Sequence, residues 1–232
     1  MARRLEQPIA RTRGDKELIM SYLDLRRAIG VLGVSLPVVL AIGAIVIDDV
    51  SGIESSISDY HATLMRGVFV GVLWALGVFL YSHIGEVPRP GRKRYEPTDN
   101  IAGNMAGAFA LGVALFPNSG GGLVDNVHFV SAAALFLVLA YFSLVIFPRS
   151  EKADSEDRLP QKSIRLKIYR ICGVVMLACL VLIALYNLLL GAESGLADIS
   201  PVFWLESLAL WAFGFSWFIY GETLFGGPRL SR

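Results

Sequence analysis

The sequence predicts an all-α membrane protein, a bundle of six transmembrane helices with both termini in the cytoplasm. Of its 232 residues, 54% are hydrophobic and only 18% are charged, whereas soluble domains carry about 25% charged residues. Six long apolar runs alternate with polar loops, and 20 of the 21 lysines and arginines fall in alternate loops and the two tails. This composition and this alternation are typical of a polytopic membrane protein.

The apolar runs give the expected spans. Most have the roughly 20 residues that are needed to cross about 30 Å of hydrocarbon. Small residues four apart, which allow helices to approach closely, occur as Gly67 and Gly71 in the second span and as Gly103 and Gly107 in the third. Because the third span is short and rich in small residues, we expect it near the centre of the bundle. The spans are predicted at 28–47, 62–82, 101–116, 127–147, 168–190 and 202–220.

The distribution of basic residues sets the orientation. The amino-terminal tail holds seven, the second loop four, the fourth loop with its helix entry seven, and the carboxyl tail two. The first, third and fifth loops hold none, and the remaining basic residue is Arg66. The positive-inside rule therefore places both termini in the cytoplasm. We expect a multi-pass protein of the cytoplasmic (inner) membrane of a bacterium.

Four regions follow from this topology. Residues 1–27 form a basic cytoplasmic segment, which is either an amphipathic helix in the headgroup region or a solvated tail. Residues 28–220 form the transmembrane domain, 148–167 a charged cytoplasmic loop within it, and 221–232 a cytoplasmic tail. Because the basic residues follow the membrane face, we expect membrane lipids as partners and no nucleic acid.

A set of polar residues is expected at the outer ends of the spans. An ionisable side chain in a membrane helix usually faces the bundle interior and has a partner there. Arg66 lies about 9 Å into the second span and Glu206 about 7–8 Å into the sixth. The similar depth predicts an ion pair between them, with Asp59 and Asp125 as helix N-caps. The full outer set is Asp59, His61, Arg66, Asp125, His128 and Glu206.

Two functional interpretations use the same residues. In one, His61, His128, Asp59 and Asp125 bind zinc and support a metal-dependent membrane hydrolase, since imidazoles and carboxylates are zinc ligands. The chain has no HExxH or HxxxH motif. In the other, the residues form a pocket in which Arg66 grips a lipid headgroup or another small polar ligand.

The run Tyr60-His61-Ala62-Thr63-Leu64 resembles the histidine motif of the alkaline-ceramidase branch of the CREST membrane hydrolases. This resemblance implies a zinc amidase built from a serine, an aspartate and a paired histidine motif. Ile57 stands at the serine position, four residues before the histidine, and Ser56 and Ser58 flank it. More broadly, the chain resembles small six-span bacterial membrane proteins without an assigned activity.

A second polar set is expected at the cytoplasmic ends of the spans. It consists of Asp99, Asn100 and Asn104 at the start of the third span and Glu222 after the sixth. Asn100 and Asn104 lie one turn apart on one helix face. We expect them to fix helix packing through amide hydrogen bonds. A small transporter would need polar groups between the inner and outer sets, and the middle of the second and third spans offers almost none.

These observations predict a non-enzymatic membrane protein with an outward-facing polar pocket around Arg66. The pocket would bind a lipid, a small ligand or a membrane-protein partner, without a cofactor. The alternatives are a zinc-dependent hydrolase and, second, a small transporter. Glycine-rich second and third spans are also compatible with a homodimer.

Overall fold

A computed structural model describes residues 13–47, 52–83, 99–153, 160–190, 195 and 197–223. This part of the chain is helical and contains no strand, which confirms the predicted all-α class. The α-helices are α1 (Arg13–Ile47), α2 (Arg66–Tyr81), α3 (Asp99–Leu115), α4 (Leu123–Tyr141), α5 (Phe147–Ala153), α6 (Pro160–Leu189) and α7 (Pro201–Tyr220). Short 3-10 or π segments are η1 (Ser58–Ala62), η2 (Phe142–Ile146) and η3 (Ala197–Ile199).

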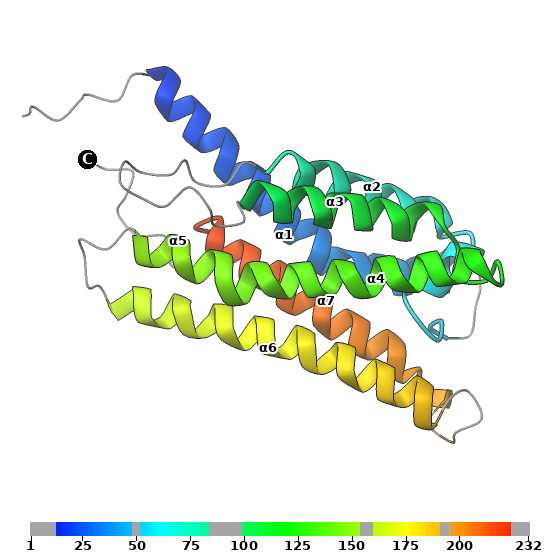
Figure 1. Cartoon of the computed structure of the whole chain (residues 1–232). Helices are drawn as coiled ribbons and strands as arrows, with labels where there is room; N and C mark the ends of the chain where they lie inside the picture. Colours follow the sequence, from blue (N-terminus) through cyan, green and yellow to red (C-terminus); the bar gives the residue numbers. More distant parts are fainter. Residues whose placement is uncertain are drawn as a thin grey trace, which may run out of the picture.

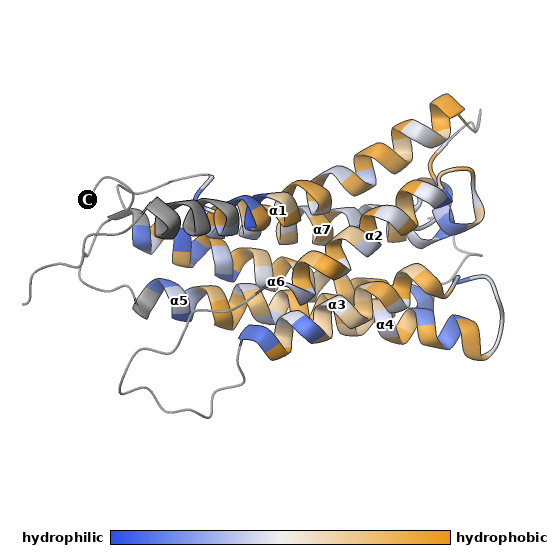
Figure 2. Ribbon diagram, turned by 90° about the horizontal axis from the view of Figure 1, so that it is seen from above, coloured by the Kyte–Doolittle hydropathy of each residue, from blue (hydrophilic) through white to orange (hydrophobic). Residues whose placement is uncertain are grey.

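Four helical segments in the described chain are long and apolar enough to cross a membrane. They are Tyr22–Ile47, Leu123–Glu151, Lys162–Leu189 and Ala197–Tyr220, and α2 is a shorter apolar helix. Hydrophobic residues dominate the middle of the bundle, and hydrophilic residues gather toward its two ends (Figure 2). The chain therefore has the architecture of a multi-pass membrane protein.

The helices form a closed ring. Each of α1, α2, α3, α4, α6 and α7 packs against the next one, and α7 packs against α1. Figure 1 shows α2 and α3 side by side along one flank, with α4, η2 and α5 following one another as a nearly continuous rod. Pro148, in α5, lacks an N–H group and clashes with the carbonyl four residues earlier. The π segment that precedes it widens the turn at that point.

Glycines bring α2 and α3 into backbone contact. A Cβ atom on Gly107 would lie 2.7 Å from the carbonyl oxygen of Gly77, and one on Gly103 would lie 2.6 Å from that of Leu80. Both distances are too short for a real Cβ atom. Close helix packing by the predicted pair in the third span is therefore confirmed.

The other small-residue pair behaves differently. A Cβ atom on Gly67 or Gly71 would meet no atom within 4 Å, so this pair makes no close helix contact within the described part of the chain, and its use in a homodimer stays a prediction. These glycines occupy the outward face of α2.

The predicted segment 1–27 and the first span are not separate elements. From Arg13 the chain is helical and runs without a break into the span as α1. Residues 1–12 lie outside the described part. The same holds for 224–232 of the predicted cytoplasmic tail.

The predicted loop 148–167 is much shorter than expected. α5 continues to Ala153 and α6 already begins at Pro160, so only residues 154–159 of this stretch lie outside the part of the chain that the structure describes. The Arg165 guanidinium lies 3.5 Å from the Glu151 carboxylate, and these side chains are only 6% and 7% exposed. Glu151 and Arg165, whose charges suggested a solvated loop, are instead packed between α5 and α6, where each neutralises the other.

An aromatic cluster fills the bundle at this same end. The imidazole of His83 is 1% exposed. It stacks on Tyr22 with ring centroids 5.6 Å apart and meets the edge of Trp217 at 5.1 Å. The guanidinium of Arg26 lies 3.7 Å above the ring of Tyr220. The other buried rings of the cluster are Phe142, Phe147 and Tyr169.

The predicted inner polar residues lie near this end. Asp99 and Asn100 begin α3, and Glu222 follows α7. One amide atom of Asn104 lies 3.3 Å from the carbonyl oxygen of Tyr81 and 3.2 Å from that of Asn100. Because carbonyl oxygens only accept hydrogen bonds, that atom is the amide nitrogen. Asn104 therefore links α3 to α2, as the sequence predicts.

We expect Gly107→Ala to lower the free energy of unfolding by about 1–3 kcal/mol, because a methyl group would push α2 and α3 apart. Gly71→Ala is the matched control on the facing helix, since open space surrounds that position. Thermal unfolding of both purified variants in one detergent measures the difference. Equal stability of the two variants would contradict the close approach.

Burial lowers the pKa of His83 to about 3, and the charge of Arg26 adds to the decrease. In the unfolded chain the imidazole has a pKa near 6.5. Between pH about 3 and about 6.5, the unfolded chain therefore binds more protons than the folded chain. Stability should therefore fall as the pH drops from about 6.5 toward about 3, by up to roughly 1.4 kcal/mol per pH unit. His83→Phe should lessen this dependence, which unfolding curves of both proteins at pH 7, 6 and 5 would reveal.

Candidate functional site

The segment that enters α2 folds over the end of the bundle at which α2 begins, and it is fixed to α7. The backbone N–H of Ile57 donates to a carboxylate oxygen of Glu206 at 2.6 Å. The N–H of Phe203 donates to the carbonyl of Ser55 at 3.0 Å. Tyr60 is fully buried beneath this segment, where burial raises the pKa of its phenol. The phenol therefore stays neutral and accepts the N–H of Glu54 at 3.3 Å.

The same segment explains where α2 begins. Thr63 has an extended backbone conformation, and its hydroxyl donates to the carbonyl of Tyr60 and accepts the N–H of Met65. Such local side-chain bonds compete with a regular helix. The second span was expected from residue 62, but α2 begins only at Arg66.

Two histidines bind the carboxyl end of α3. His61 Nε2 lies 3.3 Å from the carbonyl oxygen of Ala114, and His128 Nδ1 lies 2.6 Å from that of Phe116. The last carbonyls of a helix have no partner within it. Both imidazoles are buried and supply donors to these carbonyls. Sequence reasoning placed both histidines at this end of the bundle, and the structure brings them to one helix terminus.

His128 makes a second hydrogen bond. Its Nε2 lies 2.8 Å from the hydroxyl oxygen of Ser58. The carbonyl of Phe116 can only accept, so the proton of a neutral ring is on Nδ1. The Nε2 atom is then an acceptor, and the Ser58 hydroxyl donates to it.

The two aspartates have different surroundings. Asp59 accepts the side-chain amide of Asn118 at 2.6 Å. Asp125 accepts the backbone N–H groups of Gly120 and Gly121 at 2.8 and 2.9 Å. The N-cap positions are Met65 for α2 and Gly122 for α4. The prediction that the aspartates are N-caps is therefore wrong: each fixes a loop instead.

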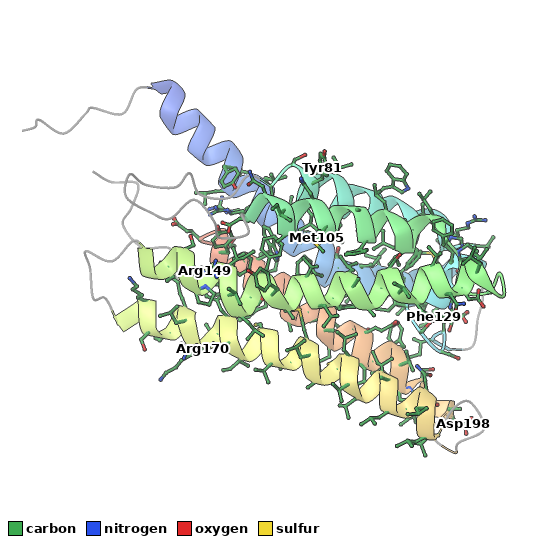
Figure 3. All side chains as sticks on the ribbon, viewed as in Figure 1. Tyr81, Met105, Phe129, Arg149, Arg170 and Asp198 are labelled. Carbon is green, nitrogen blue, oxygen red and sulfur yellow. The ribbon has the colours of Figure 1, made fainter. Side chains whose placement is uncertain are left out.

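A cavity of about 640 Å³ lies beside these groups, between α4, α6, α7 and the segment from Ser55 to Asp59. Its apolar lining residues are Phe129, Ala132, Ala133, Phe136, Leu180, Ile183, Ala184 and Val202. Most of its polar lining residues belong to loops and helix ends at one end of the bundle: Ser55, Ser56, Ser58, Asp59, Asn118, His128, Asn187 and Ser200. Glu206 lies further into α7. Phe129 and Asp198 mark this end of the molecule, and Arg149 lies toward the opposite end (Figure 3).

The predicted ion pair between Arg66 and Glu206 is wrong. Arg66 is exposed at the first residue of α2, and no ion pair in the described part of the chain involves it. The partner of Glu206 is the N–H of Ile57. Because the helix starts later than expected, Arg66 lies outside the bundle interior and needs no neutralising carboxylate. Neither Arg66 nor Asp125 lines the cavity.

The zinc interpretation finds no matching ligand set. Among the described residues, no group of three or more His, Cys, Asp or Glu side chains is placed to hold a metal ion. Both nitrogens of His128 bond to protein atoms, and Asp125 bonds to loop amides.

Sequence reasoning missed several polar residues that line the cavity, among them Ser58 and Asn118. Ser58 begins η1 and Asn118 follows α3, and both lie in stretches rich in small polar residues, where serine and asparagine are common turn formers. Only their contacts with distant parts of the chain distinguish these two residues from ordinary turn residues, and the sequence does not show those contacts.

No protein-family model, curated protein or solved structure matches this chain. The arrangement of the site therefore carries the functional argument.

We expect Glu206→Leu to lower the free energy of unfolding by about 1–3 kcal/mol, because the N–H of Ile57 would lose its acceptor in a buried place. Glu206→Gln keeps an acceptor and should cost less. Arg66→Ala should change stability by less than about 0.5 kcal/mol, as is usual for an exposed side chain. Chemical denaturation of the three variants tests this order. A larger loss of stability for Arg66→Ala than for Glu206→Leu would instead support the predicted ion pair between Arg66 and Glu206.

Proposed function

We propose that this chain is a membrane protein that binds an amphipathic ligand in the cavity between α4, α6 and α7. The observation that carries this proposal is the division of one cavity into an apolar wall and a polar end. Ligand sites are typically concave, largely apolar and about 300–1,000 Å³ in volume, with a few polar groups that fix orientation. A volume of about 640 Å³ falls in this range.

The orientation proposed for the protein follows from its charges. All six apolar helices would cross the cytoplasmic membrane, with both termini inside, because 20 of the 21 basic residues lie in the tails and alternate loops. The polar end of the cavity would then face the outer leaflet. The polar lining residues would then lie near the lipid headgroups, where the headgroup of a bound ligand would also lie.

The entrance lies between α4 and α6. Three apolar lining residues on these helices, Phe129, Ala133 and Ala184, are exposed on the outside of the bundle. A ligand dissolved in the bilayer could therefore enter sideways, with its chain against the apolar wall, and need not cross the aqueous phase.

The charges of the lining select the headgroup. Asp59 contributes a carboxylate, and none of the described lining residues is a lysine or an arginine. An anionic headgroup would be desolvated beside a like charge without a cation to bind it. We therefore propose an uncharged, hydroxyl-bearing headgroup. Arg66, which the sequence suggested as the gripping residue, takes no part.

Monodecanoylglycerol is a suitable probe, with decyl phosphate as its anionic counterpart. Binding at saturating concentration should raise the melting temperature of the purified protein by about 5–10 °C. Ala184→Phe fills the cavity wall and should abolish the increase. Ala178→Phe, on an exposed position of the same helix that does not line the cavity, should preserve it.

An equal increase in both phenylalanine variants would place binding elsewhere. An increase with decyl phosphate as large as that with monodecanoylglycerol would overturn the proposed headgroup.

A further inference from the structure

The contact between Ser58 and His128 has the geometry of a nucleophile with its base. The hydroxyl oxygen and Nε2 are 2.8 Å apart, within the distance of about 2.6–3.2 Å at which a base can take the proton of a nucleophile. Ser58 and His128 come from η1 and α4, which are far apart in sequence, and both line the cavity.

The orientation of the ring is also the productive one. The carbonyl of Phe116 holds the proton of His128 on Nδ1 at 2.6 Å. In Ser-His-Asp hydrolases a carboxylate accepts this same N–H and keeps Nε2 free to act as a base. Here a backbone carbonyl at the end of α3 has that position. Because it carries no full charge, it orients the ring but stabilises an imidazolium less than a carboxylate does.

We infer that Ser58 is a nucleophile and His128 its general base in the hydrolysis of an uncharged ester amphiphile. This inference rests on the proposed ligand site, and it adds a reaction to binding. The ester would lie with its acyl chain on the apolar wall and its carbonyl carbon at the Ser58 hydroxyl.

The reaction has two steps, with water as the second substrate. The Ser58 oxygen bonds to the acyl carbon while its proton passes to His128 Nε2, and the bond from the acyl carbon to the alcohol oxygen breaks. The leaving alcohol takes the proton from Nε2. A water molecule then gives one proton to Nε2 and adds its oxygen to the acyl carbon. The acyl-serine bond breaks, Ser58 recovers the proton, and a fatty acid is released.

Neighbouring groups suit this substrate and this product. The Asn118 amide nitrogen donates one of its two hydrogens to Asp59 at 2.6 Å, and the second can meet an oxygen of the substrate. The fatty acid becomes a carboxylate at neutral pH. Asp59 repels that anion but not the uncharged ester, so the charge of the site favours release of the product.

Ser35 provides a control serine outside the cavity. It lies on α1 and is not a lining residue, and its hydroxyl donates to the carbonyl oxygen of Leu32 at 3.4 Å. Unlike Ser58, it therefore has a backbone carbonyl and not an imidazole as its acceptor.

The test uses the full chain purified in detergent. A fluorophosphonate should label Ser58, located by peptide mass spectrometry, and the wild type should release decanoate from monodecanoylglycerol. Ser58→Ala should reduce release by at least about 100-fold, the lower range for loss of acid–base and nucleophilic assistance, and Ser35→Ala should change it by less than about twofold. The melting-temperature increase with monodecanoylglycerol should persist in Ser58→Ala, which shows that this variant is folded and binds.

A fluorophosphonate label that is absent from Ser58, or decanoate release that is unchanged in Ser58→Ala, overturns the inference. If the melting-temperature increase persists in that case, catalysis alone is rejected and the binding site stands. If the wild type shows no increase either, the proposed function is rejected as well.

Discussion

The last carbonyl oxygens of a helix have no donor within it, and one that is left unpaired away from water is costly. At the carboxyl end of α3, two buried imidazoles donate to such carbonyls: His61 to that of Ala114 and His128 to that of Phe116. The two histidines come from η1 and α4. Their position in turn determines much of the outer end: η1 must lie beside α3, and the first turns of α4 must face it. The cavity and the contact with Ser58 both follow from that placement.

The helices could be predicted from the sequence because each depends on a local property. A run of apolar residues is sufficient to specify a buried or lipid-facing helix, and glycines four apart were enough to anticipate the packing of Gly103 and Gly107 on α2. Small residues alone did not show which face of a helix meets a neighbour, so Gly67 and Gly71 looked equally suited to packing. The helical ends within 148–167 were missed because Glu151 and Arg165 suggest solvation until they are seen to pair.

The site was anticipated only in part, for reasons that individual residues make clear. Asp59, His61, His128 and Glu206 were expected at the outer end, because the order of the spans brings their helix ends together. The partner of Glu206 is a backbone N–H, a group that nearly every residue carries and that no sequence pattern marks. Arg66 drew attention as the isolated cation, yet hydrogen bonds of Thr63 delay the start of α2 and leave Arg66 outside. The most suggestive contact, that of Ser58, joins two ordinary residues that are 70 positions apart.

Glu151 and Arg165 constrain the order in which the protein can be assembled. Glu151 is synthesised before Arg165, and burying one charge of the pair before the other is in place would be costly. We therefore expect the rod that ends in α5 to reach its final packing together with α6, as a hairpin.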